Sequence, residues 1–193
     1  MSATASPSGL ADEFRVVATL LSDALNRLGR PYYIGGSVAS SMHGVMRATA
    51  DIDFVSVVMR GDGERLAAQL DGQFYLAVAA VEEAISKGTS FNLIHFETSL
   101  KLDVFVAHTD LFTRLAMERA KVHSSGLRIA TVEDTLLAKL RWFRDGGSIS
   151  DRQWGDILGM LRVSASVLDT LYCDEMALVV GVVDLLAKAR SEV

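Results

Sequence analysis

Three aspartates in strand-like segments have a spacing that suits a divalent cation. Asp51 and Asp53 are separated by one residue at the start of an apolar run, and Asp103 lies in a later segment of alternating residues. Because successive side chains of a strand point to opposite faces, Asp51 and Asp53 project from one face, about 7 Å apart. Their oxygens suit Mg²⁺ or Mn²⁺, and a neighbouring strand that carries Asp103 on this face would supply a third ligand.

A glycine pair ahead of these aspartates suggests a phosphate site. Gly35 and Gly36 follow a short β-prone run and precede Ser37, after which the chain has the pattern of a short helix. Two glycines let backbone N–H groups approach an anion closely, and the Ser37 hydroxyl can donate a further hydrogen bond. A phosphate cradle with metal-binding carboxylates is typical of phosphoryl or nucleotidyl transfer, in which one carboxylate can activate the attacking hydroxyl.

Hydrophobic periodicity predicts the elements that position these residues. A spacing of three and four residues predicts a helix over 10–28, whereas runs rich in Val and Ile predict strands. Alternation over 99–107 places Asp103 on the face opposite the leucines. The other expected strands are 31–34, 52–58, 74–80, 91–96 and 127–130, and the other expected helical segments are 38–43, 61–70, 81–87 and 111–122.

The pattern becomes helical from Thr131 onward. Thr131 can cap a helix that runs to about Phe143, with Asp134 where a capping box has glutamate. We therefore expect an α/β (α+β) chain, with a mixed β-sheet core flanked by helices over 1–130. A helical portion over 131–193 is expected to pack on it as a single compact unit. The apolar stretch 177–187 is too short to span a membrane and is expected to be a buried helix.

Composition narrows the class of protein. Half of the 193 residues are hydrophobic, which is ample for a core, and a single cysteine, Cys173, excludes a disulfide scaffold and a cysteine metal cage. The net charge of −5 argues against a broadly basic surface for long duplex nucleic acid. With no signal-peptide pattern and no spanning segment, we expect a cytoplasmic protein without a membrane partner.

The order of the motifs resembles the nucleotidyltransferase superfamily (polymerase-beta-like), in which Gly-Ser or Gly-Gly-Ser precedes Asp-x-Asp. His43-Gly44 and Arg47-x-Thr49, just before Asp51, are similar to the bacterial abortive-infection and toxin–antitoxin nucleotidyltransferases. The resemblance covers about 32–161, and its most specific part is the first block, over 35–53. Its helical half includes Glu133-Asp134, Lys139-Leu140, Arg152-Gln153 and Asp156-Ile157.

The resemblance implies a role for each matching residue. It assigns metal binding to Asp51, Asp53 and Asp103, of which Asp103 is the candidate base, and it assigns Lys139 to the triphosphate. The implied nucleotide site also includes Gly35, Gly36, Ser37, Arg47, Thr49, Arg152 and Asp156. Mg²⁺ or Mn²⁺ would be the cofactor, and an NTP such as ATP the substrate.

Structural roles compete with several of these assignments. Lys139 lies beside a core-facing stripe of its helix, so it is either a phosphate ligand or a lysine that only packs its stem. Arg152 and Asp156 are four residues apart, and an ordinary surface pair on a helix is slightly favoured for them. His43 is expected to be structural, because no second His or Cys lies nearby at metal-ligand spacing, and Cys173 to be inert and partly buried.

These observations predict a Mg²⁺-dependent nucleotidyltransferase that moves a nucleoside monophosphate from an NTP to a hydroxyl of tRNA, a protein or a small molecule. One form of this expectation is an enzyme of toxin–antitoxin type, with an antitoxin or toxin protein as partner. The alternatives are a catalytically inactive nucleotidyltransferase-fold binding partner and an antibiotic-modifying nucleotidyltransferase. Segment 139–152 has four basic and two acidic residues, which suits NTP phosphates or an RNA end if it lies beside the aspartates.

Overall fold

The computed structural model describes residues 7–43 and 51–193, whose contacts group into two units. The sheet unit comprises the described residues of Met1–Ile34, Ala50–His108 and Val122–Arg128. The helical unit comprises the described residues of Gly35–Thr49, Thr109–Lys121 and Ile129–Val193. The glycine pair thus belongs with the C-terminal helices, although it precedes most of the sheet in the chain.

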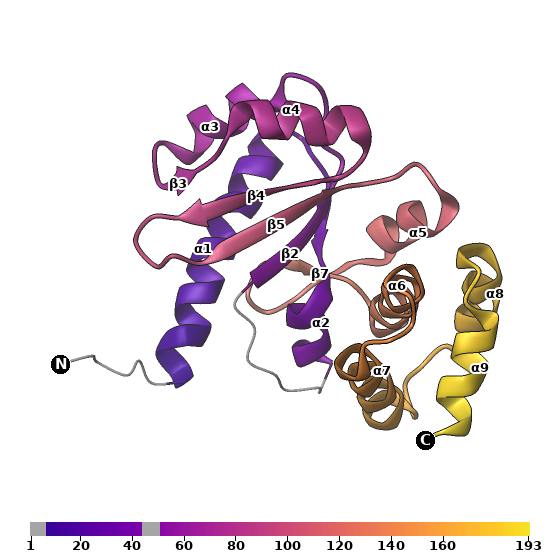
Figure 1. Cartoon of the computed structure of the whole chain (residues 1–193). Coiled ribbons are helices and arrows are strands. Elements are labelled where there is room, and N and C mark those ends of the chain that lie inside the picture. Colours follow the sequence, from indigo (N-terminus) through magenta and orange to yellow (C-terminus); the bar gives the residue numbers. More distant parts are fainter. Residues whose placement is uncertain (1–6, 44–50) are drawn as a thin grey trace. The chain divides into compact units, whose positions relative to one another are not determined.

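The described strands form one mixed sheet (Figure 1). In chain order they are β1 (Tyr32–Ile34), β2 (Asp51–Ser56), β3 (Phe74–Tyr75), β4 (Ser90–His95), β5 (Lys101–Val106), β6 (Lys121–Val122) and β7 (Arg128–Ile129). Their order across the sheet is β3-β4-β5-β2-β1-β7-β6. Strand β2 is parallel to β5, whereas the pairs β1–β2, β3–β4 and β4–β5 are antiparallel.

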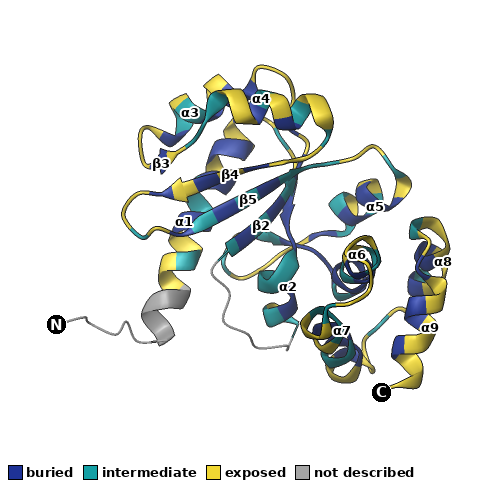
Figure 2. Ribbon diagram, viewed as in Figure 1, coloured by how far each residue is buried: buried dark blue, intermediate teal, exposed yellow. Residues whose placement is uncertain are grey.

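Three helices build the core of the sheet unit. They are α1 (Pro7–Arg27), α3 (Asp62–Leu70) and α4 (Val78–Lys87); α1 packs on α3, α3 on α4, and α4 on β4. Along β2, every second side chain is buried, beginning with Ile52 and Phe54, and Leu102 and Val104 are buried in the same way on β5 (Figure 2). The period-two pattern therefore separates an apolar face of these strands from a polar one.

Helix α3 is held at its N-terminus by side chains distant in sequence. The fully buried carboxylate of Asp62 accepts two hydrogen bonds from the Arg30 guanidinium, at 2.6 and 3.1 Å, and one from the Met59 backbone N–H. Glu82 of α4 accepts hydrogen bonds from the backbone N–H groups of Gly61 and Gly63. Glu82 thus satisfies N–H groups that a helix start leaves unpaired, and Asp62 ties the preceding loop and Arg30 to the same helix end.

The helical unit contains six described helices around its own core. They are α2 (Gly36–Met42), α5 (Leu111–Arg119), α6 (Val132–Asp145), α7 (Asp151–Ser164), α8 (Thr170–Val180) and α9 (Val183–Ser191). Helix α6 packs against α2, α7 and α8, and its Leu136, Leu137 and Leu140 are fully buried. The expected cap is confirmed, since Thr131 Oγ1 accepts a hydrogen bond from the Asp134 backbone N–H.

The structure corrects the prediction in three places. Over 74–80, only Phe74–Tyr75 is a strand, and α4 begins at Val78. Lys121–Val122 forms a short strand where a helix was expected to continue. The stretch 177–187 is not one buried helix: it breaks at Gly181, where φ is 74°, and Leu178 is 72% exposed. Only one side of this stretch packs inward, so its mean apolarity overstated its burial.

Among the described helices, none combines the length and apolarity needed to cross a membrane.

Candidate functional site

The three predicted aspartates share one face of the sheet unit. In the parallel register of β2 and β5, Asp53 lies directly opposite Asp103, and Asp51 lies opposite Lys101. All four side chains are half-buried, while Ile52, Phe54, Leu102 and Val104, which alternate with them, are buried. The structure therefore brings Asp51, Asp53 and Asp103 together on the polar face of two neighbouring strands, as the alternation predicts.

Lys101 belongs to this carboxylate face and was not predicted as a site residue. Its Nζ donates a hydrogen bond to Asp103 Oδ2 at 2.7 Å. That hydrogen bond raises the pKa of Lys101; burial opposes the rise, and the charges of Asp103, Asp51 and Asp53 add to it. The signal in the sequence is its position two residues before Asp103, which places both side chains on one face.

The residue types on this face suit a divalent cation, but the side-chain positions differ from a finished metal site. Carboxylate oxygens are the ligands that Mg²⁺ and Mn²⁺ prefer. Within residues 7–43 and 51–193, however, no three His, Cys, Asp or Glu side chains are placed so that they could hold a metal ion. The ammonium group of Lys101 instead donates a hydrogen bond to an oxygen of Asp103.

Strand β4 extends the polar face on the other side of β5. Asn92 lies opposite Asp103, and Ile94 lies opposite Lys101; both residues of β4 are exposed. Asn92, Asp103 and Asp53 consequently form a row across three strands. Sequence reasoning missed Asn92 because its neighbour is set by strand pairing rather than by local spacing.

The glycine pair opens α2 in the helical unit. Gly35 is the N-cap residue, and Gly36 has a φ of 56°, a left-handed conformation that favours glycine. Ser37 is half-buried, and its carbonyl accepts a hydrogen bond from the Ser41 hydroxyl. His43 Nε2 lies 2.9 Å from the Ala130 carbonyl oxygen, which fits the expected structural role. Arg47 and Thr49 lie outside the described residues.

Lys139 and Asp156 meet between α6 and α7. Lys139 Nζ donates a hydrogen bond to Asp156 Oδ2 at 3.0 Å, and the two side chains are only 13% and 10% exposed. The expectation that Asp156 forms a surface pair with Arg152 is wrong, because Asp156 faces inward whereas Arg152 is exposed. Two predicted site residues are thus joined in one nearly buried ion pair.

Other cations of segment 139–152 also have acidic partners. Arg141 lies 3.9 Å from Asp110, and Arg144 bonds to Asp184 of α9. The positive charge counted in this segment is therefore partly offset within the helical unit.

A buried polar cluster joins α5, α6 and α8. Arg119 bonds to Glu133 at 3.1 Å and to Asp134 at 3.4 Å, and its guanidinium lies 3.7 Å from the centre of the Tyr172 ring. Asp134 also accepts hydrogen bonds from the hydroxyls of Thr131 and Tyr172. Burial alone would raise the pKa of Glu133, but backbone hydrogen bonds and the Arg119 charge hold it below its usual value. These contacts give Glu133 and Asp134 a structural role.

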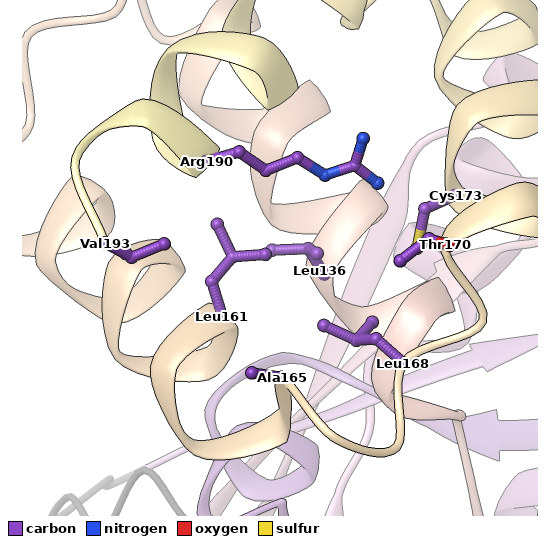
Figure 3. Close-up of a pocket in the computed structure, with 8 residues that line it drawn as sticks. All are labelled: Leu136, Leu161, Ala165, Leu168, Thr170, Cys173, Arg190 and Val193. Atoms are coloured by element: carbon purple, nitrogen blue, oxygen red, sulfur yellow. The ribbon is translucent and has the colours of Figure 1, made fainter.

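An apolar cavity of about 170 Å³ lies elsewhere in the helical unit (Figure 3). Leu136, Leu161 and Leu168 line it, together with Cys173 and Arg190. Burial, which acts with the nearby Glu133 charge, raises the pKa of the Cys173 thiol to about 12. Arg190 bonds to Asp174. The thiol is therefore unreactive at neutral pH, in agreement with the expected inert cysteine.

The fold matches solved nucleotidyltransferase structures, although the sequences have diverged. No protein-family model and no curated protein sequence matches the chain. An antigenic nucleotidyltransferase-like protein from Paracoccidioides brasiliensis is 16% identical, with a TM-score of 0.51 and 92% of each chain covered. ANT(2")-Ia in complex with adenylyl-2"-tobramycin is 14% identical, with a TM-score of 0.52 over 93% of this chain and 98% of that one. The expected nucleotidyltransferase fold is confirmed.

Proposed function

We propose that the protein is a metal-dependent nucleotidyltransferase that moves a nucleoside monophosphate from an NTP to a hydroxyl group. The observation that carries this proposal is the register of β2 and β5, which sets Asp53 opposite Asp103 with Asp51 on the same face. Carboxylates so close together repel one another, so a face of this kind is stabilised by cations beside it. The shared fold with nucleotidyltransferases supports the same activity.

Asp51, Asp53 and Asp103 would hold Mg²⁺ or Mn²⁺. When bound, the cation neutralises negative charge on the phosphates during transfer. Asp103 accepts the proton of the acceptor hydroxyl, whose oxygen forms a bond to the α-phosphorus. The bond from the α-phosphorus to the bridging oxygen of the β-phosphate breaks, and pyrophosphate leaves.

The motif resemblance also assigns nucleotide binding to residues of the helical unit. Gly35, Gly36 and Ser37 offer backbone N–H groups and a hydroxyl to phosphate oxygens. Lys139 supplies positive charge to the leaving phosphates, and Asp156 holds its ammonium group at 3.0 Å. Arg47, Thr49 and Arg152 complete the proposed nucleotide site by the motif resemblance alone.

The acceptor is a tRNA end, a protein or a small molecule. The neighbour captured with adenylyl-2"-tobramycin favours a small-molecule acceptor as one candidate, and with it an antibiotic-modifying activity. A toxin–antitoxin role with a partner protein is the other form of the proposal. The opposing hypothesis is an inactive member of this fold that serves as a binding partner.

Transfer of label from α-³²P-NTPs tests the proposal. The purified protein with Mg²⁺ or Mn²⁺ is expected to label an RNA, a protein or a small molecule in a cell extract, and Asp53→Asn to abolish that labelling. Asp23→Asn, at an exposed carboxylate of α1, is the matched control and should transfer normally. If no NTP is transferred under any condition, or if Asp53→Asn matches the wild type, the transferase proposal fails and the inactive binding partner is favoured.

A further inference from the structure

An internal cation already lies among the three aspartates. The Lys101 ammonium group bonds to Asp103 Oδ2 at 2.7 Å, and the charges of Asp51 and Asp53 also act on it. Lys101 is opposite Asp51 in the strand register, and Asp103 is opposite Asp53, so the four residues form a compact two-by-two group. One positive charge thus offsets part of three negative ones on this face.

A divalent cation that uses Asp103 must contend with this ammonium group. Both are attracted to the same carboxylate, and like charges within about 4–6 Å repel. Among the described residues, no three ligating side chains are placed to hold a metal ion, and Lys101 bonds to Asp103.

We propose that Lys101 is a built-in counter-cation, which holds Asp103 in the metal-free protein and yields that carboxylate when a divalent cation binds. This inference rests on the proposed function. Lys101 therefore weakens binding of the metal alone. An NTP adds negative charge at the site and offsets the repulsion, so metal and nucleotide bind cooperatively.

Calorimetric titration of Mn²⁺ tests the competition. Lys101→Met is expected to bind Mn²⁺ about tenfold more tightly than the wild type, because a competing charge is removed. Lys101→Arg keeps a positive charge and should stay near the wild-type affinity. Lys87→Met is the matched control, since Lys87 also bonds to a carboxylate, Glu83, but on exposed α4; it should leave Mn²⁺ affinity unchanged.

Thermal unfolding gives a second readout that needs no activity. Without metal, Lys101→Met should have a lower Tm than the wild type, because Asp103 loses the ammonium group that bonds to it. Saturating Mn²⁺ should close that gap, since the metal replaces the ammonium group. A lower Tm that Mn²⁺ leaves unchanged would mean a purely structural lysine and would overturn the inference.

The outcomes separate this inference from the proposed function. If the wild type binds Mn²⁺ and Lys101→Met binds it equally or more weakly, the counter-cation role is wrong while the transferase proposal stands. If neither protein binds Mn²⁺, with or without a nonhydrolysable NTP analogue, both fail. Should Lys101→Met not fold, Lys101→Gln carries the same expectations.

Discussion

Lys139 of α6 and Asp156 of α7 form an ion pair, with Nζ 3.0 Å from Oδ2, in which both side chains are almost fully buried. Lys139→Met and Asp156→Asn are each expected to lower the free energy of unfolding by about 3 kcal/mol, because each removes the partner of a nearly buried charge. Lys139→Met/Asp156→Leu removes both charges and should recover most of that loss. Urea unfolding measures all three variants.

The same double variant separates a structural lysine from a phosphate ligand. If Lys139 binds the leaving phosphates, the double variant regains stability but transfers label at least about 100-fold more slowly than the wild type. Recovery of both stability and transfer would assign Lys139 to packing alone.

Asp53 and Asp103 are expected to act as one functional unit. Each Asn substitution should lower the rate of transfer by about 10²–10⁴-fold, and the double variant should be little worse than either single one, because both lose the same assembled site. Initial rates of label transfer at saturating NTP measure this. If the fold-loss of rate in the double variant equals the product of the fold-losses in the two single variants, the two carboxylates work independently.

Asp62 makes the stability of the sheet unit depend on pH. Burial on its own raises the pKa of Asp62, but hydrogen bonds from Arg30 and the Met59 N–H bring it below its usual value. The unfolded chain therefore takes up this proton at a higher pH than the folded chain. The stabilisation of the folded protein by Asp62 is complete above the ordinary pKa of an aspartate, about 4. It is lost as the pH falls through the pKa that Asp62 has in the folded protein.

The variant Asp62→Asn isolates this contribution. At pH 7 it should lower the free energy of unfolding by about 3–5 kcal/mol, because the buried Arg30 contact loses its charge partner. The difference in the free energy of unfolding between Asp62→Asn and the wild type should become smaller as urea unfolding is repeated from pH 5 down to pH 3. The variant Asp23→Asn should show no such difference, and a constant difference for Asp62→Asn would contradict the ionic explanation.

Tyr172 is expected to ionise at a higher pH than an ordinary tyrosine. Burial raises the pKa of Tyr172, and its hydrogen bond to the Asp134 carboxylate raises it further. Since the folded pKa is the higher one, the contribution is present below the ordinary pKa and is lost as the pH rises toward the folded value. Absorbance titration should show a phenol group that ionises above the ordinary pKa of tyrosine, and Tyr172→Phe should remove this signal.

The same substitution has a stability readout at neutral pH. Loss of the hydroxyl should lower the free energy of unfolding by about 1–3 kcal/mol, because Asp134 loses a hydrogen bond in a buried place. If Tyr172→Phe instead removes a phenol that titrates near the ordinary value, the described contact with Asp134 does not form in solution.

Local patterns predicted most of the strands and the face on which the acids lie, but not the short strand Lys121–Val122. The alternation around Asp51, Asp53 and Asp103 predicts this face, because the side chains of a strand alternate with a period of two regardless of which strand lies beside it. The neighbour itself depends on register, which is a property of the assembled sheet. The position of Asn92 beside Asp103 was missed for this reason. The bond between Lys101 and Asp103 lies within β5, and their spacing of two residues is its signal in the sequence.

Contacts between distant segments escaped prediction altogether. Nothing near Gly61 indicates that Glu82, on another helix, satisfies its N–H group. Asp156 was assigned to a helical surface because its spacing from Arg152 allows it, but the packing of α7 on α6 turns it toward Lys139. Local spacing says which contacts are allowed, and tertiary packing selects among them.

The parallel pairing of β2 with β5 also bears on folding kinetics. Parallel strands require a crossover, and here it comprises residues 57–100 with α3, β3, α4 and β4. Asp53 meets Asp103 only when this whole segment has closed, and such non-local contacts form late. If a cation binds at these aspartates as proposed, we expect it to slow unfolding and to leave the refolding rate unchanged.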